Sequence, residues 1–502
     1  MDNTLKSICI VGGGTTGWMA ASLLSSVLKG SDISITVVES PDIASIGVGE
    51  STVPSIMDFL SVCQINPKEF IEATSASFKL GIRFDDWLKP GHSYFHPFGK
   101  VGQEVNGYEF YQVWLKTLAD GHSTRWVDHS PSAIMAENHR FMLGSAQYKM
   151  PLPQYNYALH LDAVLVARYL RELSQVRGVK RVEATVDQVV LDERQCIDSL
   201  KLNSGAVVTA DFFIDCTGFK GLLIEEALKV GYESWDKYLP CDRAVAVQTK
   251  NSENLAPYTI STAREAGWTW KIPLQHRTGN GYVFSGQHCS DDKAVDALLS
   301  AVDGDVISDP KVIPFVTGRR KKVWHKNCLA LGLASGFLEP LESTAIHLVY
   351  QSLIHFIRHF PDADFDICQE DQFNSKVNAD YQEVRDFIIL HYCTSDRDDT
   401  EFWQWCKTMP VPDSLHEKIE LFRERGQLQG GKNDFFGSDS WYSILEGMNV
   451  RPKKYHPLMN AFNDKELAQL LEGSSQKMHD IVLRMPTHGD FIKKNCFSKP
   501  FS

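Results

Sequence analysis

Residues 8–21 read Ile8-Cys9-Ile10-Val11-Gly12-Gly13-Gly14-Thr15-Thr16-Gly17-Trp18-Met19-Ala20-Ala21, and this stretch decides the fold. A short β-branched run turns on glycines into a helix, which we expect from Trp18 to Leu28. Gly12 permits the tight turn, Gly14 lets the backbone approach a pyrophosphate, and Gly17 lets helix and strand pack closely. The N-terminus of the helix then offers unpaired N–H groups to phosphates.

A second strand gives these glycines the context of a dinucleotide site. We predict it at Ile33-Ser34-Ile35-Thr36-Val37-Val38, ending at Glu39. An acidic residue about twenty positions past the glycines binds an adenosine ribose. A plain glycine-rich turn in a βαβ unit is the weaker alternative in this context. The predicted cofactor residues here are Gly12, Gly14, Thr15, Thr16, Gly17 and Glu39.

Composition narrows the class of protein. The chain has 502 residues and a net charge of −12, so it has enough length for two or three domains, and the acidic balance argues against nucleic acid or an anionic membrane as the main partner. We expect no signal peptide and no membrane span. The eleven cysteines are scattered and form no C-x-x-C pair. They predict reduced thiols in the cytoplasm and no metal site.

Two further motifs follow the Glu39 strand. The first is Ile46-Gly47-Val48-Gly49-Glu50-Ser51-Thr52-Val53-Pro54, before a helical stretch at 56–60. Its glycines and hydroxyls suit a backbone strap against a ligand ring, with Gly49 and Ser51 as contacts. The alternative is a plain helix start capped by Ser51 or Thr52. The second motif is Phe78-Lys79-Leu80-Gly81-Ile82-Arg83-Phe84, where a lysine in an apolar run would usually snorkel to water.

Residues 94–157 are rich in aromatic side chains and poor in regular periodicity. Their segment Phe95-His96-Pro97-Phe98 suits either a packed loop or flat walls for an aromatic ligand. We then predict a helix from Leu161 to Leu170 and strands at 182–190 and 199–208. Residues 212–218 read as a buried parallel strand, and the chain returns to the first domain through residues 328–334. The fold is therefore α/β, with a dinucleotide-binding sheet rebuilt from discontinuous segments.

The remaining chain contains a second sheet region and many helices. Trp268, Trp270 and Ile272 alternate onto one face of a strand, which by itself indicates core. Ser343-Thr344 precedes an apolar run and predicts a helix N-terminus able to present N–H groups to an anion. His347, His355 and His359 follow at helical spacing and favour a partly buried polar face over a metal site. Residues 398–402 read as a capped helix start.

Four of these motifs together resemble the flavin-dependent tryptophan halogenases. They are Gly12 to Gly17, Phe78-Lys79-Leu80-Gly81, Trp268-Thr269-Trp270-Lys271-Ile272-Pro273 and Phe337-Leu338-Glu339-Pro340-Leu341-Glu342-Ser343-Thr344. W-x-W-x-I-P is a signature of that family. The resemblance extends from the first strand to at least Gly447 and includes Arg385-Asp386-Phe387-Ile388 and His391-Tyr392. It implies a GR2-like Rossmann domain that binds FAD, a mostly helical substrate-binding part, and a homodimer.

The expected organisation follows from this resemblance. Residues 1–100, 151–230 and 311–350 would form three parts of the FAD-binding domain. Residues 101–150 would be an aromatic-rich insertion at the substrate site, and residues 231–310 a sheet region with the W-x-W-x-I-P motif. Residues 351–502 would form the helical substrate-binding region.

The resemblance also implies a chemistry and its residues. Reduced FAD, O2 and chloride or bromide yield hypohalous acid, with the halide at the backbone N–H groups of Thr344 and Ala345 and with Leu338 beside the flavin. Ala345 stands where the family usually has glycine. Lys79 would then hold the hypohalous acid, either as a haloamine or by a hydrogen bond, with Glu342 as its partner carboxylate. His96 and Phe98 match positions that flank the aromatic substrate.

The sequence also bears on the source of the reduced flavin and on the class of substrate. No second nucleotide motif is evident, so a separate NAD(P)H-dependent reductase would supply the reduced flavin. Tryptophan halogenases hold free tryptophan with tyrosines, a glutamate and an aromatic–tryptophan pair, whereas residues 427–440 here are short and glycine-rich. We therefore expect indole or an indole-bearing compound as substrate. An FAD-dependent monooxygenase, oxidase or redox flavoprotein without halogenation is the alternative, and it needs neither Lys79 nor Glu342.

Overall fold

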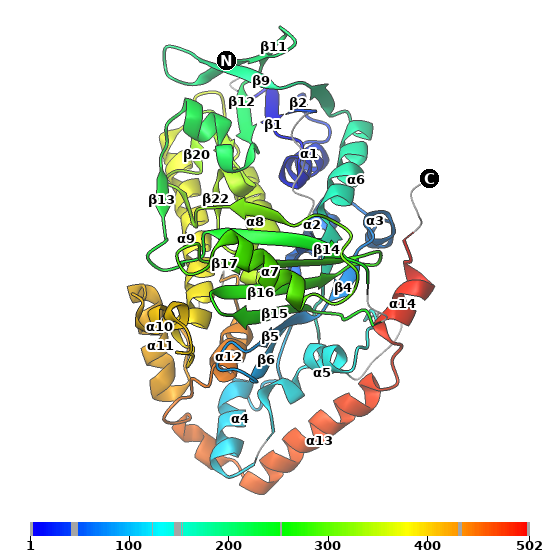
Figure 1. Ribbon diagram of the computed structural model, residues 1–502, viewed down its shortest axis with the longest axis vertical. Coiled ribbons are helices and arrows are strands. Elements are labelled where there is room, and N and C mark those ends of the chain that lie inside the picture. Colours follow the sequence, from blue (N-terminus) through cyan, green and yellow to red (C-terminus); the bar gives the residue numbers. More distant parts are fainter. Residues whose placement is uncertain are drawn as a thin grey trace.

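The fold has a nucleotide-binding sheet at one end, a second large sheet in the middle and helices at the other end (Figure 1). The computed structural model describes residues 4–41, 49–122, 124–144, 152, 154–251, 254–429 and 434–498. Residues 46–48 of the expected strap and residues 430–433 of the glycine-rich segment lie outside the described residues.

The nucleotide-binding sheet has six strands drawn from five separate parts of the chain. Their order is β20 (Trp324–His325), β21 (Cys328–Ala330), β12 (Phe212–Asp215), β1 (Ser7–Val11), β2 (Ser34–Glu39) and β8 (Lys180–Glu183). All neighbouring pairs are parallel except β20 with β21. Apolar side chains fill β1 and β12 because both faces of the sheet are covered. The predicted α/β class and the discontinuous sheet are confirmed.

Two helices that pack against each other lie beside this sheet, α1 (Thr15–Val27) and α6 (Ala163–Val176). The sequence predicted helical residues from Leu161, but Leu161 and Asp162 belong to β7 (Ala158–Asp162). The helix begins only after Asp162 because its side chain accepts hydrogen bonds from the N–H groups of Val164 and Leu165.

The strand expected at 182–190 is two strands in two sheets. β8 pairs with β2, whereas β9 (Val186–Leu191) pairs with β10 (Ile197–Leu202), which in turn pairs with β11 (Val207–Thr209). The chain changes sheets at Thr185, whose hydroxyl lies 2.8 Å from that of Ser40. Alternating burial can continue through such a change of partner, so the sequence pattern alone does not reveal it.

The second large sheet has seven strands, and its edge strand carries His96 of the candidate site. Its order is β18 (Lys311–Pro314), β14 (Arg243–Thr249), β17 (Thr278–Phe284), β16 (Gly267–Pro273), β15 (Thr259–Arg264), β5 (Gly81–Asp85) and β6 (Ser93–Pro97). Only the β15–β5 pair is parallel. His96 lies in the edge strand β6. The aromatic-rich region therefore begins with regular structure.

A small three-stranded sheet brings the strap next to Lys79. β7 pairs antiparallel with β3 (Gly49–Ser51) on one side and with β4 (Ser77–Lys79) on the other. Thr52 directly follows β3, so its backbone and Lys79 both lie against the same central strand. This arrangement links the strap to the lysine.

Helices cover the sheets and form the far end of the molecule (Figure 1). They are α2 (Ser55–Val62), α3 (Pro67–Thr74), α4 (Phe110–Ala119), α5 (Pro131–Glu137), α7 (Asp291–Ala301), α8 (Ala345–Arg358), α9 (Ile367–Cys393), α10 (Glu401–Thr408), α11 (Asp413–Arg425), α12 (Ser438–Gly447), α13 (Asp464–Val482) and α14 (His488–Asn495). The capped start predicted at 398–402 is α10, where the Thr400 side chain accepts from the N–H of Trp403. Among the residues described, no helix combines the length and apolar character that crossing a membrane requires.

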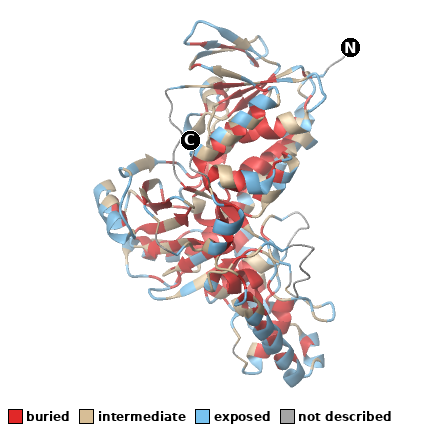
Figure 2. Ribbon diagram, turned by 90° about the vertical axis from the view of Figure 1, so that its right-hand side faces the viewer, coloured by how far each residue is buried: buried red, intermediate tan, exposed pale blue. Residues whose placement is uncertain are grey.

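One large hydrophobic cluster joins the layers. It extends from Ile8 in β1 and Trp18 in α1 through Phe387 in α9 to Leu471 in α13. Figure 2 shows buried segments from the upper part of the molecule through its middle to the helices at the lower end. The nucleotide-binding end and the helical end therefore share a core, which holds the candidate site rigidly between them.

Candidate active site

The glycine loop between β1 and α1 needs glycine at three positions for packing alone. Gly12 has φ +112°, and a Cβ there would lie 2.3 Å from the carbonyl oxygen of Cys216. A Cβ at Gly17 would lie 1.9 Å from the carbonyl oxygen of Gly12, which confirms the predicted close packing. Gly13, which the sequence argument passed over, would place a Cβ 1.6 Å from Glu39 Oε2.

Gly14 differs because its surroundings are open. A Cβ there would meet no atom within 4 Å, and its φ of −76° is one that any residue adopts. It is the N-cap of α1, and no side chain caps that helix. Uncapped helix N–H groups beside open space fit a phosphate, so this loop fits the pyrophosphate of a dinucleotide.

The other residues predicted to bind the cofactor, Thr15, Thr16 and Glu39, make contacts that hold the glycine loop and the end of β2 in place. The Thr15 hydroxyl donates to the carbonyl of Ala163 at 3.2 Å, and Thr16 packs against Gly332. Glu39 accepts a hydrogen bond from Trp18 Nε1 at 3.1 Å and pairs with Arg181. The structure therefore fixes the Glu39 carboxylate at the end of β2, where a ribose would lie beside the glycines.

The described part of the strap is held by side-chain hydrogen bonds. The Ser51 hydroxyl lies 2.8 Å from that of Thr259, and Thr52 Oγ1 donates to the carbonyl of Leu159 at 2.6 Å. The N-cap of α2 is Pro54, and no side chain caps it. The interpretation of Ser51 or Thr52 as helix caps is therefore wrong, because both hydroxyls bind neighbouring strands.

Lys79 is fully buried, so the expectation that it would snorkel to water is wrong. Its Nζ donates to the Thr52 carbonyl and to Ser343 Oγ, both at 2.9 Å, and lies 4.9 Å from the centre of the Phe98 ring. Burial lowers the pKa of Lys79 from 10.5 to about 7, although the negative charge of Glu342 acts in the opposite direction. The amine therefore changes protonation state near neutral pH.

Ser343 connects this lysine to the start of α8. It adopts the left-handed conformation, with φ +62°, directly before the N-cap Thr344 and the first helical residue Ala345. No side chain caps α8, so its first N–H groups are available to an anion, as predicted from the Ser343-Thr344 pair. Leu338 lies buried between β22 (Gly336–Phe337) and the short helix η5 (Pro340–Glu342).

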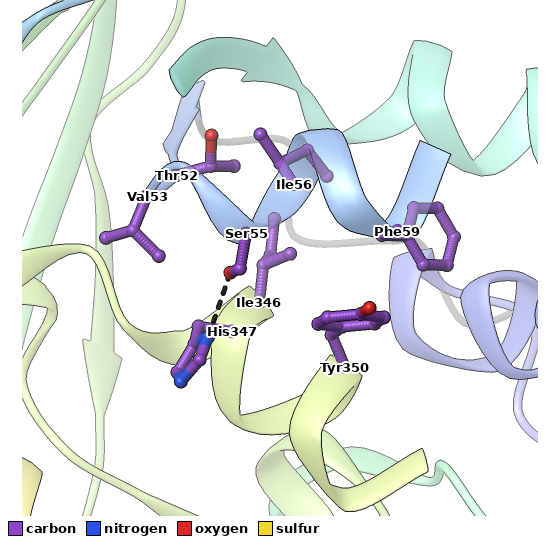
Figure 3. A pocket seen from close by; sticks show the side chains of 8 residues that line it. All are labelled: Thr52, Val53, Ser55, Ile56, Phe59, Ile346, His347 and Tyr350. Carbon is purple, nitrogen blue, oxygen red and sulfur yellow. Dashed lines mark hydrogen bonds between the residues drawn. The ribbon is translucent and has the colours of Figure 1, made fainter. Parts of the chain in front are cut away.

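A small pocket lies between α2 and the first turns of α8. Figure 3 shows that its side chains converge from the two helices, with the Ser55 hydroxyl 2.9 Å from His347 Nδ1 across it. The lining residues are Thr52, Val53, Ser55, Ile56, Phe59, Ile346, His347 and Tyr350. The pocket therefore adjoins both the strap and the α8 N-terminus.

Glu342 is the centre of a buried hydrogen-bond chain. Its Oε2 lies 2.9 Å from His96 Nδ1, and its Oε1 lies 2.8 Å from His391 Nε2. The Tyr94 hydroxyl lies 2.6 Å from His391 Nδ1. Burial acts to raise the pKa of Glu342, but its interactions with His96 and His391 lower it, from 4.5 to about 2. The group is therefore a carboxylate at neutral pH.

A second buried carboxylate supports the segment that carries Glu342. Glu339 Oε2 accepts from Trp268 Nε1 at 2.7 Å and from the Tyr392 hydroxyl at 2.6 Å. Burial raises the pKa of Glu339 to about 7, although both hydrogen bonds lower it. Trp268 of the W-x-W-x-I-P motif is itself buried core, so it acts on the site through Glu339.

Aromatic rings surround the other face of His96. The ring centre of His96 lies 6.3 Å from that of Phe98, 5.7 Å from that of Phe387 and 6.5 Å from that of Phe436. Phe436 stacks on Phe387 with centres 3.7 Å apart. His96 and Phe98, predicted to flank an aromatic ligand, therefore lie together with Phe387 and Phe436, to which the sequence pattern gave no role in the site.

The segment before α12 is pinned by α9. Phe435 stacks on His347 with ring centres 3.6 Å apart. The N–H groups of Phe435 and Phe436 donate to the two carboxylate oxygens of Glu383, at 3.1 and 2.8 Å. The sequence showed this segment only as short and rich in glycine, and the adjacent Phe435 and Phe436 were the available signal.

The three histidines at helical spacing have separate partners. His347 Nδ1 contacts Ser55, His355 Nε2 lies 2.9 Å from Asp380, and His359 Nδ1 lies 2.9 Å from the carbonyl oxygen of His355. These contacts agree with the partly buried polar face that the spacing favoured.

The fold and these residues define an α/β dinucleotide-binding enzyme with a buried lysine and carboxylate beside an aromatic-lined site. A family profile described as tryptophan halogenase matches residues 7–464. The chain belongs to the tryptophan halogenase family, whose members are flavin-dependent halogenases.

Individual relatives cover nearly the whole chain. BrvH, a flavin-dependent halogenase from Brevundimonas sp. BAL3, is 42% identical with a TM-score of 0.94 and covers 98% of this chain and 99% of its own. A flavin-dependent halogenase from Xanthomonas campestris is 39% identical with a TM-score of 0.95, over 99% and 100% of the two chains. The tryptophan 6-halogenase SttH from Streptomyces toxytricini is 36% identical over 85% of each chain.

Proposed function

We propose that this protein halogenates indole, or an indole-bearing compound, in preference to free tryptophan. It uses FADH2, O2 and chloride or bromide, and receives the reduced flavin from a separate NAD(P)H-dependent reductase. We infer that it works as a homodimer in the cytoplasm. The observation that carries the proposal is the buried Lys79 amine, which interacts with the Glu342 carboxylate and lies over the Phe98 ring.

The flavin site is assigned to residues that fit a dinucleotide. Gly12, Gly14, Thr15, Thr16 and Gly17 hold the pyrophosphate, Glu39 the ribose, and Gly49, Ser51 and Leu338 the ring system. When bound there, reduced FAD would activate O2, and O2 would supply the two-electron oxidation that turns a halide ion into hypohalous acid. The strap runs from this assigned site to Lys79 through the Thr52 carbonyl.

Gly14→Val tests the cofactor assignment. A Cβ at this position would meet no protein atom within 4 Å, so we expect the fold to survive, but the side chain would occupy the space assigned to the pyrophosphate. FAD affinity should fall by roughly 100-fold, measured by fluorescence titration. The matched control is Gly473→Val in α13, where a Cβ also meets open space. Equal FAD affinity in both variants would show that the loop holds another ligand.

The halide and the halogenating agent are assigned to the start of α8 and to Lys79. The backbone N–H groups of Thr344 and Ala345 hold the halide at the uncapped helix N-terminus. The Lys79 amine receives the hypohalous acid, either as a haloamine when neutral or through a hydrogen bond when charged. A pKa of about 7 makes both forms accessible at neutral pH.

The preference for indole is supported by the aromatic rings near His96 and by the carboxylates near them, which already have partners. Binding free tryptophan requires a carboxylate for its ammonium group, and each charge-assisted hydrogen bond is worth roughly 1.5–3 kcal/mol. The Glu383 carboxylate beside this wall is occupied by the N–H groups of Phe435 and Phe436. Asp439 pairs with Lys100 at 3.2 Å. The rings of Phe98, Phe387 and Phe436 suit a flat aromatic ligand, with about 0.5–1.5 kcal/mol per ring pair beyond area burial.

We expect indole to be halogenated at C3, with kcat/KM at least about tenfold above that of tryptophan, since one lost charged hydrogen bond accounts for that factor. C3 is the most electron-rich carbon, and no polar anchor is assigned that would expose another edge. The experiment supplies FAD, a flavin reductase, NADH and bromide, and follows initial rates and product masses on both substrates. A preference for tryptophan, halogenated on its benzo ring, contradicts the proposal.

A further inference from the structure

His96 combines two features that no other role in the site explains. Its ring is almost fully buried, and its Nδ1 is held by Glu342 at 2.9 Å. Its Nε2 is also buried but has no hydrogen-bond partner in the protein. A buried polar atom without a partner is unfavourable, and at His96 it leaves Nε2 open to a partner from outside the chain.

The hydrogen-bond chain determines which nitrogen of His96 carries the proton. Glu342 is a carboxylate and can only accept, so Nδ1 of His96 and Nε2 of His391 must both donate to it. Burial lowers the pKa of His391, so its ring is neutral and its Nδ1 accepts from the Tyr94 hydroxyl. In the neutral His96 ring the lone pair is therefore at Nε2.

The surroundings of His96 suit a proton acceptor. Phe98, Phe387 and Phe436 lie around the ring, and the titratable groups that interact with it are Glu342 and His391. A carboxylate behind an imidazole fixes its tautomer and stabilises the imidazolium that forms when the far nitrogen takes a proton. Glu342 itself has both oxygens occupied by histidines.

We propose that His96 is the general base of the halogenation step, with Nε2 taking the proton that the aromatic ring loses and Glu342 holding the opposite nitrogen. The inference rests on the proposed function, because it uses the same site and the same aromatic substrate. It gives the ring proton a defined acceptor, and it makes Glu342 a positioning residue that acts through His96.

The step balances as arene plus hypohalous acid giving halogenated arene plus water. A ring carbon forms the carbon–halogen bond while the halogen–oxygen bond breaks, and the departing hydroxide takes a proton from the Lys79 ammonium. The ring C–H bond then breaks, its electron pair restores the aromatic system, and its proton goes to His96 Nε2. That proton afterwards leaves for solvent, and Lys79 takes up another.

The test is the hydrogen isotope effect on halogenation of the ring-deuterated arene that the wild type converts fastest, expected to be indole. In the wild type the base removes the proton quickly, so the isotope effect should be close to one. His96→Phe keeps a flat ring but lacks a base. Its halogenation rate should fall by about 10²-fold and a primary isotope effect should appear, because C–H cleavage becomes rate-limiting.

His96→Gln provides the second variant should the phenylalanine fail to fold, because its amide can still donate to Glu342 while its carbonyl is not a base. The matched control is His129→Phe, since His129 is equally buried with one unpartnered ring nitrogen but bonds only a threonine hydroxyl at 3.2 Å. It should behave as the wild type. FAD affinity reports folding in every variant.

The outcomes separate the inference from the proposed function. A wild type that halogenates no arene overturns both. Halogenation by the folded His96 variants with an isotope effect still close to one overturns the inference alone, whether or not the rate falls. An isotope effect that appears only in the His96 variants supports it.

Discussion

Lys79→Met is expected to abolish halogenation, lowering its rate by at least about 10³-fold, while reduced FAD is still oxidised by O2 at the wild-type rate. The substitution nearly keeps the side-chain length and removes the amine that contacts Thr52 and Ser343. Product masses report halogenation, and flavin absorbance reports oxidation. A product yield close to that of the wild type would exclude Lys79 as the group that holds the halogenating agent.

The matched control for this variant is Lys116→Met. Lys116 is also buried, but it lies in α4 and pairs with Asp120 and Asp464, at 2.6 and 2.8 Å. Removing it should lower stability and leave halogenation in the folded fraction intact. The contrast separates loss of a buried lysine from loss of this particular amine.

The difference in stability between the wild type and Lys79→Met should also depend on pH in a predictable direction. The folded pKa of about 7 lies below the ordinary 10.5, so the unfolded chain binds more protons between these values. Wild-type stability relative to Lys79→Met should therefore rise with pH across this window, by about 1.4 kcal/mol per unit, and stay level below pH 7. Thermal midpoints of the two proteins over this range measure it, and a constant difference contradicts a buried, destabilised ammonium.

The dinucleotide-binding half could be predicted from sequence because its requirements are local. Gly17 meets the backbone of Gly12 within one turn, and Gly12 needs its own φ of +112°. Helix, strand and acid then follow within thirty residues. The predicted bounds of strands and helices were wrong where the same local pattern continued although the segment changed its pairing strand or its secondary structure. The alternating segment 182–190 belongs to two sheets, with the change at Thr185. The helix expected from Leu161 begins only after its N-cap, Asp162.

The candidate site could be predicted only in part because its contacts are long-range. Glu342 meets His96 and His391 across 246 and 49 positions, and no periodicity records such pairings. The resemblance drew attention to Lys79 and Glu342, but the hydrogen bond from Lys79 to Ser343 and the stacking of Phe436 on Phe387 required the fold. Taken alone, the apolar run around Lys79 favoured an amine that reaches water, whereas the structure buries this amine and bonds it to Thr52 and Ser343.

Glu342→Gln is expected to slow halogenation by up to about 10²-fold and to leave flavin oxidation unchanged, although the side chain keeps its shape. The carboxylate accepts from one nitrogen of each histidine, whereas glutamine has one acceptor oxygen and one donor group. One histidine must therefore change its tautomer or lose its partner. Either change disturbs the Nε2 lone pair of His96 or the Tyr94–His391 hydrogen bond.

Glu339→Gln is the matched control, because it alters a buried carboxylate three positions away that contacts Trp268 and Tyr392 instead of the histidines. Both donors meet the same oxygen, which a glutamine carbonyl can replace, and Glu339 Oε1 has no partner to lose. This variant should retain halogenation within a few fold. Equal losses in the two variants would show that Glu342 acts only by supporting the fold.

The pH dependence of the stability of Glu342→Gln tests independently whether the two histidines hold Glu342 as a carboxylate. The folded pKa of about 2 lies below the ordinary 4.5, so the ionised carboxylate stabilises the fold above pH 4.5 and loses that contribution as pH falls toward 2. The wild type should be more stable than the variant at neutral pH, by about 1–3 kcal/mol for the disrupted hydrogen bonds. Thermal midpoints of the two proteins should converge as the pH is lowered through this window. A difference that persists unchanged would mean that the two histidines do not hold Glu342 as a carboxylate.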